Sequence, residues 1–131
     1  MSSAVKEDHL KKVLYIEDNP VNIKLVKKIL ASRFKVRLTS SHIPELGIEL
    51  AKSEKPDLIF LDINLPGMDG YQVLEIFKQD SELQKIPVVA ITDNSSVLDI
   101  EKGKNAGFDD YITKPVDIKK FNHVIDQYLK I

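Results

Sequence analysis

Polar residues of four types follow short apolar runs in this sequence, and together they could hold a phosphoryl group. Glu17-Asp18, Asp62 and Thr92 each stand at or just after the end of such a run, and Lys114 follows the short strand predicted over 110–112. Apolar runs of four to six residues closed by turn residues are typical of buried strands. In an α/β sheet, ligands bind at the edge where the carboxyl ends of parallel strands meet. We therefore expect these side chains to share one site.

Three carboxylates at one sheet edge would repel each other. Two unit charges about 4 Å apart repel by about 4 kcal/mol at an effective dielectric constant near 20. A divalent cation removes this repulsion, and oxygen ligands without nearby histidine or cysteine favour Mg²⁺. Lys114 adds a second positive charge and Thr92 adds a hydroxyl group. A carboxylate beside Mg²⁺, a lysine and a hydroxyl is typical of a site that holds and transfers a phosphoryl group.

The elements that would position these residues alternate between strands and amphipathic helices. Strands are predicted over residues 13–16, 34–39, 58–62, 87–91 and 110–112, and helices over about 20–32, 44–53, 70–79, 96–106 and 117–130. Five strand-helix units predict an α/β fold with a parallel sheet, right-handed crossovers and helices on both faces. The helix over 96–106 has few apolar residues and is expected to be weakly held.

The sequence predicts the roles of single residues at the starts of two helices. Asn19 followed by Pro20 is typical of a capped helix start. On a helical wheel, Val21 falls on the apolar side, and so does Asn22, which is either buried with a partner or aimed at the site. In the closing helix, Ile118 falls on the apolar face.

Composition limits the classes of function. The 131 residues with 43% hydrophobic content fit one domain, and 19 basic against 20 acidic residues disfavour nucleic-acid binding. No apolar run approaches about 20 residues, so membrane insertion is not expected. The sequence has no cysteine, so a reducing compartment is the simplest location. We expect a cytoplasmic protein with a mobile tail over residues 1–11 and a domain over residues 12–131.

From Lys12 onward the sequence resembles the receiver domain of two-component response regulators. The resemblance rests on Glu17-Asp18, Asp62, Thr92 and Lys114-Pro115, and on the stretches 65–70 and 106–113. It implies a flavodoxin-like, chemotaxis-regulator-like fold with five parallel strands in the order 2-1-3-4-5 and five helices. Residues 19–22 are similar to receivers of hybrid histidine kinases, so a free-standing relay and an excised hybrid-kinase receiver both stay open.

The resemblance also implies roles for the site residues. Asp62 would take a phosphoryl group from a phosphohistidine and form an acyl phosphate. Glu17, Asp18, Asp62 and the backbone carbonyl of Asn64 would hold Mg²⁺. Lys114 would pair with Asp62 and then with a phosphoryl oxygen, and the Lys114-Pro115 bond would be cis.

Phosphorylation would act through a switch rather than through turnover of a substrate. The resemblance implies that Thr92 moves toward the phosphoryl group and that Tyr111 swings into the space it leaves. The chain would then be a signalling domain, not an enzyme, that assists its own phosphorylation and autodephosphorylation. Its partners would be a histidine kinase or phosphotransfer protein and a downstream protein, and it would be a monomer or a phosphorylation-dependent dimer.

One position departs from the receiver pattern. Asp93 stands after Thr92, where receivers usually have alanine or another small residue. Its carboxylate would either repel an incoming phosphoryl group or recruit a water molecule or a cation. Asn64 and Asn94 flank the site and would order or block the attacking water. A degenerate receiver that only binds other proteins is therefore the alternative function.

Two further classes fit less well. Phosphohydrolases of the haloacid dehalogenase superfamily carry a second aspartate two residues after the nucleophile, where this sequence has Asn64. A flavin carrier would need a phosphate-binding loop rich in serine, threonine and glycine after the first strand, and this loop is absent from the sequence.

Overall fold

The computed structural model describes residues 10–93 and 97–130, which form a five-stranded parallel sheet with helices on both faces. The elements are β1 (Lys11–Ile16), α2 (Pro20–Leu30), β2 (Val36–Ser41), α3 (Pro44–Glu54), β3 (Leu58–Asp62), α4 (Gly70–Gln79), the short 3₁₀ helix η1 (Leu83–Lys85), β4 (Val88–Thr92), α5 (Val97–Ala106), β5 (Asp110–Thr113) and α6 (Ile118–Leu129). The strand order is β2-β1-β3-β4-β5, as expected from the resemblance. Residues 1–9, most of the expected tail, lie outside the described residues, and β1 includes Lys11.

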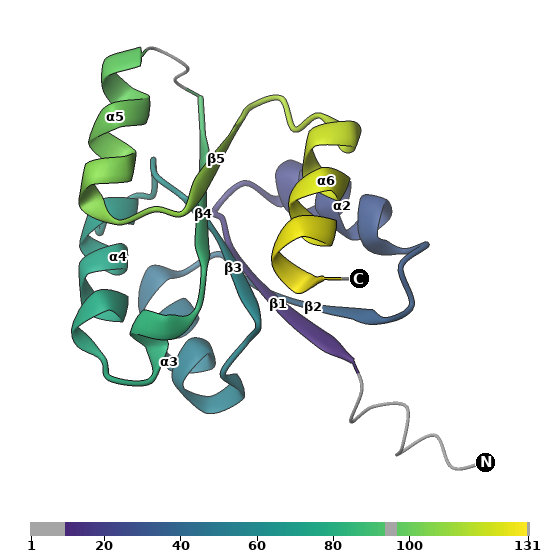
Figure 1. The fold of residues 1–131 in the computed structure, drawn as a ribbon, viewed down its shortest axis with the longest axis horizontal. Coiled ribbons are helices and arrows are strands. Elements are labelled where there is room, and N and C mark those ends of the chain that lie inside the picture. Colours follow the sequence, from purple (N-terminus) through teal and green to yellow (C-terminus); the bar gives the residue numbers. More distant parts are fainter. Residues whose placement is uncertain (1–9, 94–96, 131) are drawn as a thin grey trace.

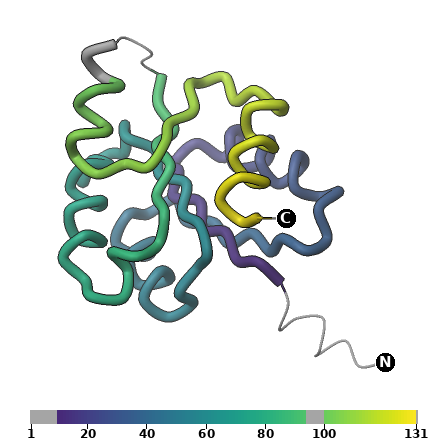
Figure 2. The backbone as a smooth tube through the Cα atoms, viewed as in Figure 1, coloured from purple at the N-terminus to yellow at the C-terminus, as the bar shows by residue number. Residues whose placement is uncertain are grey.

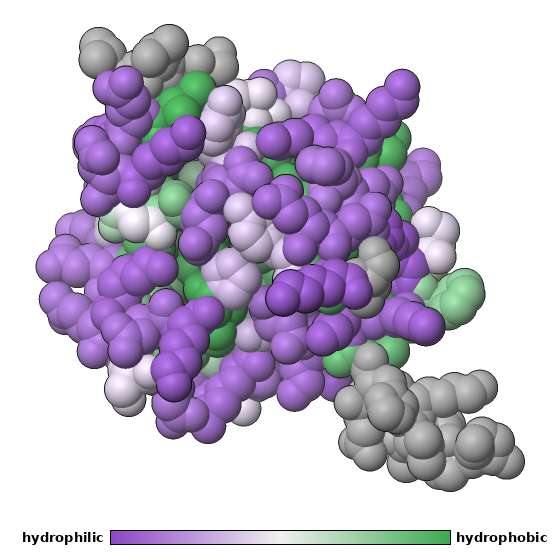
Figure 3. All heavy atoms as spheres, viewed as in Figure 1, coloured by the Kyte–Doolittle hydropathy of each residue, from purple (hydrophilic) through white to green (hydrophobic). Residues whose placement is uncertain are grey.

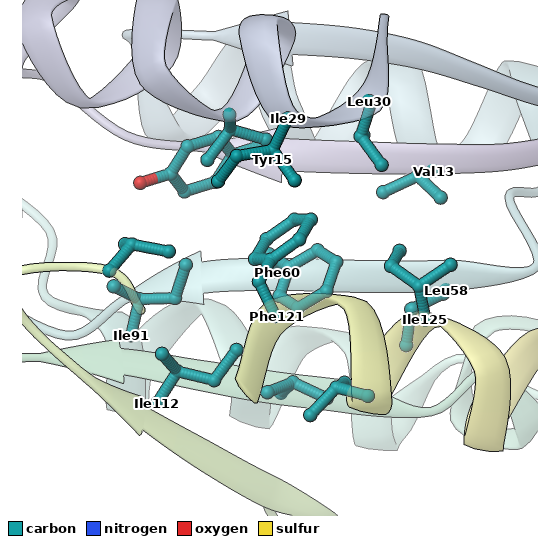
Figure 4. Packing of buried hydrophobic residues seen from close by; sticks show 14 of the residues in the cluster. Val13, Tyr15, Ile29, Leu30, Leu58, Phe60, Ile91, Ile112, Phe121 and Ile125 are labelled. Atoms are coloured by element: carbon teal, nitrogen blue, oxygen red, sulfur yellow. The ribbon is translucent and has the colours of Figure 1, made fainter. Parts of the chain in front are cut away.

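The helices form one layer on each side of the sheet. Figures 1 and 2 show α3, α4 and α5 on one side and α2 and α6 on the other. Because successive strand residues point to opposite faces, each strand contributes to two cores. The core under α2 and α6, part of which Figure 4 shows, contains Val13, Tyr15, Leu58, Phe60, Val89, Ile91 and Ile112. The core under α3 and α4 contains Leu14, Ile16, Ile59, Leu61, Val88 and Ala90.

The helices begin where the sequence indicates. Asn19 caps α2 by accepting a hydrogen bond from the Val21 amide, and Pro20 occupies the first helical position. Asp69 caps α4 in a reciprocal capping box with Gln72. At the start of α4 the chain passes so close to β3 that a Cβ atom on Gly70 would lie 2.7 Å from the carbonyl oxygen of Asp62. Glycine at this position allows α4 to begin directly beside the end of β3.

Three residues do not lie where the pattern predicted. Val21 is 70% exposed and Ile118 is 56% exposed, although both fall on the apolar side of a helical wheel. Each residue stands in the first turn of its helix. A helical wheel gives only the direction of a side chain around the helix axis, and it does not show whether the sheet extends far enough to cover that turn. Phe34 is 86% exposed and precedes β2, because a turn closed by the Val36 amide and the Arg33 carbonyl delays the strand.

The face of the molecule in Figure 3 is largely hydrophilic, with smaller hydrophobic areas among the polar side chains and at the edge of the view. None of the helices within residues 10–93 and 97–130 has the length and hydropathy to span a bilayer.

Candidate functional site

Strand alternation brings three of the candidate residues to one face of the sheet. Glu17, Asp62 and Lys114 each lie two positions after a residue of the α2–α6 core, so their side chains continue the same face. Lys114 Nζ lies 3.1 Å from Asp62 Oδ2 and 3.2 Å from Glu17 Oε1. Both carboxylates are buried, with exposures of 1% for Asp62 and 0% for Glu17. One lysine therefore bridges two buried carboxylates at the carboxyl edge of the sheet.

Asp18 adds a third carboxylate to this cluster. Ligand oxygens of Glu17, Asp18 and Asp62 all lie within 4.8 Å of one another, and the Asp18 side chain is exposed. Three carboxylates against one lysine leave uncompensated negative charge, and hard oxygen donors are those that Mg²⁺ prefers. The residues therefore fit a Mg²⁺ site. The Asn64 amide donates to Asp62 Oδ1 over 3.0 Å, while a role for the Asn64 carbonyl stays a prediction.

Glu17 accepts several hydrogen bonds besides the contact with Lys114. The Tyr15 hydroxyl donates to Oε1 over 2.7 Å and the Asn22 side-chain amide donates to Oε1 over 3.3 Å. The backbone amide of Asn19 donates to Oε2 over 3.2 Å. Asn22, left with two alternatives by the sequence, thus has Glu17 as its partner. Tyr15 was missed, although its place two residues before Glu17 puts it on the same strand face.

Thr92 and Tyr111 lie on the opposite face of the sheet. Thr92 lies two positions after Ala90 and is 7% exposed, and Tyr111 packs against the α3–α4 core. Both line a cavity of about 190 Å³ whose walls include Tyr71 and Phe108. The cavity gives Tyr111 space near Thr92, which is the juxtaposition that the predicted switch needs.

The residues expected to modulate the site lie at its rim. Asp93 follows Thr92 directly and is exposed, and Asn64 is exposed and lines the same cavity as Thr92. Asn94 lies outside the described residues. The Lys114-Pro115 peptide bond is cis, as the resemblance implied.

Most of the chain matches one known protein family. Residues 13–126 match the family model of the response regulator receiver domain. The chain belongs to this family. The receiver domain is 38% identical over 120 residues to the polar-differentiation response regulator DivK of Brucella ovis, covering 91% of this chain and 96% of that protein.

Solved receiver structures show the same fold. The receiver domain of the sensor histidine kinase PA1611 from Pseudomonas aeruginosa, which has a magnesium ion coordinated in its active-site cleft, superposes with a TM-score of 0.83 at 26% identity. The match covers 93% of this chain and 99% of that chain. A CheY-like receiver from Methanospirillum hungatei gives a TM-score of 0.81 at 26% identity over 92% of this chain and 94% of that chain.

Burial and neighbouring charges shift the pKa values of Glu17, Tyr15 and Lys114. Burial, followed by the nearby Asp62 carboxylate, raises the pKa of Glu17 above its ordinary value. Burial and the hydrogen bond to Glu17 raise the pKa of the Tyr15 hydroxyl far above its ordinary value, so Tyr15 stays a donor. Burial opposes the charge on Lys114, but Asp62 and Glu17 outweigh it and raise the pKa of the lysine. The lysine is therefore charged at neutral pH.

The raised pKa of Glu17 predicts a pH-dependent stability of the metal-free receiver. The folded state binds this proton more tightly than the unfolded state, so the stabilisation is complete below pH 4.5, the ordinary pKa, and is lost as the pH rises through the folded pKa. Each unit of upward shift corresponds to about 1.4 kcal/mol. In chelator, Glu17→Gln should therefore gain free energy of unfolding relative to wild type from pH 4.5 toward neutral pH. Urea unfolding of both proteins across this range measures the difference, and a constant difference contradicts the prediction.

Proposed function

We propose that this receiver accepts a phosphoryl group from a phosphohistidine onto Asp62 in a Mg²⁺-dependent reaction and changes conformation for phosphorelay signalling. The observation that carries this proposal is the Asp62 carboxylate, buried at the end of β3, in contact with Lys114 Nζ and within 4.8 Å of ligand oxygens of Glu17 and Asp18.

The chemistry follows from this arrangement. An Asp62 oxygen attacks the phosphorus atom, a P–O bond forms, and the P–N bond to the donor histidine breaks with its electron pair returning to the imidazole. The Asn64 amide holds Oδ1 and Lys114 holds Oδ2, which fixes the plane of the carboxylate. Glu17, Asp18, Asp62 and the carbonyl of Asn64 would hold Mg²⁺, which supplies positive charge for the phosphoryl oxygens when bound. Lys114 would then pair with a phosphoryl oxygen, and water would later release the group in autodephosphorylation.

The conformational response is proposed to run through Thr92 and Tyr111. A phosphoryl group brings nearly two negative charges and strong acceptors to the site. The Thr92 hydroxyl would donate to it, and Tyr111 would enter the space in the cavity that both residues line. The output surface would be the face of α5 and β5, whose equilibrium between two arrangements phosphorylation would shift.

Thr92→Ala tests this switch. The variant should be phosphorylated at a rate similar to wild type, because Asp62, Lys114 and the acidic cluster are unchanged. It should lose the phosphorylation-induced changes in amide hydrogen exchange over α5 and β5. The matched control is Thr113→Ala, which removes the hydroxyl of the β5 residue that pairs with Thr92 in the sheet. A wild-type exchange response in Thr92→Ala would rule out the switch role.

Asp93 supports one alternative, a degenerate receiver that acts only as an interaction module. An exposed carboxylate adjacent to Thr92 repels a phosphoryl group electrostatically. Phosphorylation of Asp93→Ala but not of wild type would assign the chain to this alternative.

Receiver domains interact with histidine kinases or phosphotransfer proteins, and we propose such a protein as the phosphodonor here. A downstream protein partner, a monomer or phosphorylation-dependent dimer, and a cytoplasmic location stay predictions from the sequence.

A further inference from the structure

We propose that Tyr15 is a positioning residue for the cation site and that it acts through Glu17. This inference rests on the proposed function. Tyr15 is the last but one residue of β1 and is 0% exposed, and its hydroxyl donates to Glu17 Oε1 over 2.7 Å. The tyrosine would touch neither the ion nor the phosphoryl group, and its effect is on the carboxylate.

The Tyr15 ring is held tightly from the side of the core. It packs edge-on against Phe60, with ring centroids 6.5 Å apart and an angle of 80° between the planes. Figure 4 shows the ring among the side chains of the α2–α6 core, with the hydroxyl oxygen pointing away from the other labelled residues. A side chain in a close-packed core has few alternative positions. The hydroxyl is therefore a donor fixed in space rather than an adaptable one.

The hydrogen bonds on Glu17 are unevenly distributed between its two oxygens. Oε1 accepts from the Tyr15 hydroxyl at 2.7 Å and from the Asn22 side-chain amide at 3.3 Å, and it forms an ion pair with Lys114 Nζ at 3.2 Å. Among the described residues, only the Asn19 backbone amide donates to Oε2, over 3.2 Å. Each carboxylate oxygen has two lone pairs. Oε1 is thus fully engaged, and the free acceptor capacity of Glu17 is on Oε2, available to a cation or to water bound to it.

The hydrogen bond from Tyr15 is the shortest of those on Glu17, and its donor is a side chain fixed by core packing. The lysine is expected to change partners when a phosphoryl group arrives, whereas the tyrosine has no other role in the site. Removing its hydroxyl would leave Oε1 held only by the longer contacts with Asn22 and Lys114, and the carboxylate could rotate away from Asp18 and Asp62. Residues that orient metal ligands in this way typically contribute about tenfold to hundredfold in metal affinity.

The test is Tyr15→Phe, which removes the hydroxyl and keeps the ring. Mg²⁺ affinity is measured by isothermal titration calorimetry, and Mn²⁺ affinity by the electron paramagnetic resonance signal of the free ion. We expect the dissociation constant to rise about tenfold for both ions. Phe60→Leu is the control for loosened packing around an intact hydroxyl. Tyr128→Phe is the control for loss of a hydroxyl elsewhere, since the Tyr128 hydroxyl donates to the Asp109 carbonyl.

Weaker ion binding in Tyr15→Phe, with wild-type affinity in Tyr128→Phe and a smaller loss in Phe60→Leu, supports the positioning role. Unchanged or tighter binding in Tyr15→Phe overturns this role and leaves the proposed function intact. An equal loss in Phe60→Leu also overturns it, because packing alone would then explain the effect. Failure of wild type to bind either ion overturns both the cation site and the role of Tyr15.

Discussion

Asp62→Asn should abolish phosphorylation of this receiver while leaving its fold intact. The amide nitrogen and oxygen of asparagine are poor nucleophiles, and no acyl phosphate forms on an amide. The metal-free variant should also be more stable than wild type, because one of three clustered carboxylates loses its charge. Intact-mass spectrometry after incubation with a small phosphodonor and Mg²⁺ measures the first effect, and urea unfolding in chelator measures the second.

Asp69→Asn is a suitable control for the loss of phosphorylation. Asp69 is an exposed aspartate in the same loop, and it caps α4, a role that asparagine also fills well. This variant should gain one phosphoryl group like wild type. A phosphoryl adduct on the Asp62→Asn variant, in a yield equal to that of wild type, would refute the assignment of Asp62.

Lys114→Met should lower the free energy of unfolding of the metal-free protein by about 3 kcal/mol at neutral pH, because removal of one partner leaves buried charge uncompensated. Lys114 is the cation shared by Glu17 and Asp62, at 3.2 and 3.1 Å, and methionine retains most of its apolar stem. The same variant should be phosphorylated more slowly or not at all, since the carboxylate loses the lysine that orients it. Chemical denaturation and intact-mass spectrometry measure the two effects.

Lys120→Met controls for the loss of a lysine on the surface. Lys120 lies 3.8 Å from Asp110 with 42% of its side chain exposed, and exposed pairs contribute about 1 kcal/mol or less. The destabilisation of Lys114→Met should become smaller when Asp62→Asn is also present, because the lysine then compensates one buried carboxylate fewer. Equal losses in Lys114→Met and Lys120→Met would show that the bridging contact does not stabilise the site.

The sequence predicted most elements well because β1, β3 and β4 each contain a short apolar run that is followed by polar residues. The helix start at Pro20 was equally clear, since capping chemistry is local to a few residues. The strand order came from the family resemblance, because alternation of strands and helices is compatible with several orders. The convergence of Asp62 and Lys114 on one sheet edge followed from the strand ends, and their pairing followed from the family resemblance.

The features that the sequence did not reveal depend on how the helices and strands are arranged in space. Val21 and Ile118 are exposed because they extend past the sheet, which a helical wheel does not represent. Asp62 and Thr92 end neighbouring strands, and strand parity makes Asp62 continue the face of the α2–α6 core and Thr92 the face of the α3–α4 core. This difference is predictable only once each strand is assigned to a core. Tyr15 has the sequence context of an ordinary strand residue, and only the three-dimensional structure shows its hydrogen bond to Glu17.

The most direct test of the account is to locate the phosphoryl group. The receiver is incubated with a small phosphodonor with Mg²⁺ or with chelator, reduced with borohydride, and analysed by peptide mass spectrometry. Reduction converts an aspartyl phosphate to homoserine, so the account predicts homoserine at position 62 only, and only in the sample with Mg²⁺. Homoserine at another aspartate, or equal conversion in chelator, would contradict it. Absence of conversion in both wild type and Asp93→Ala would also contradict it.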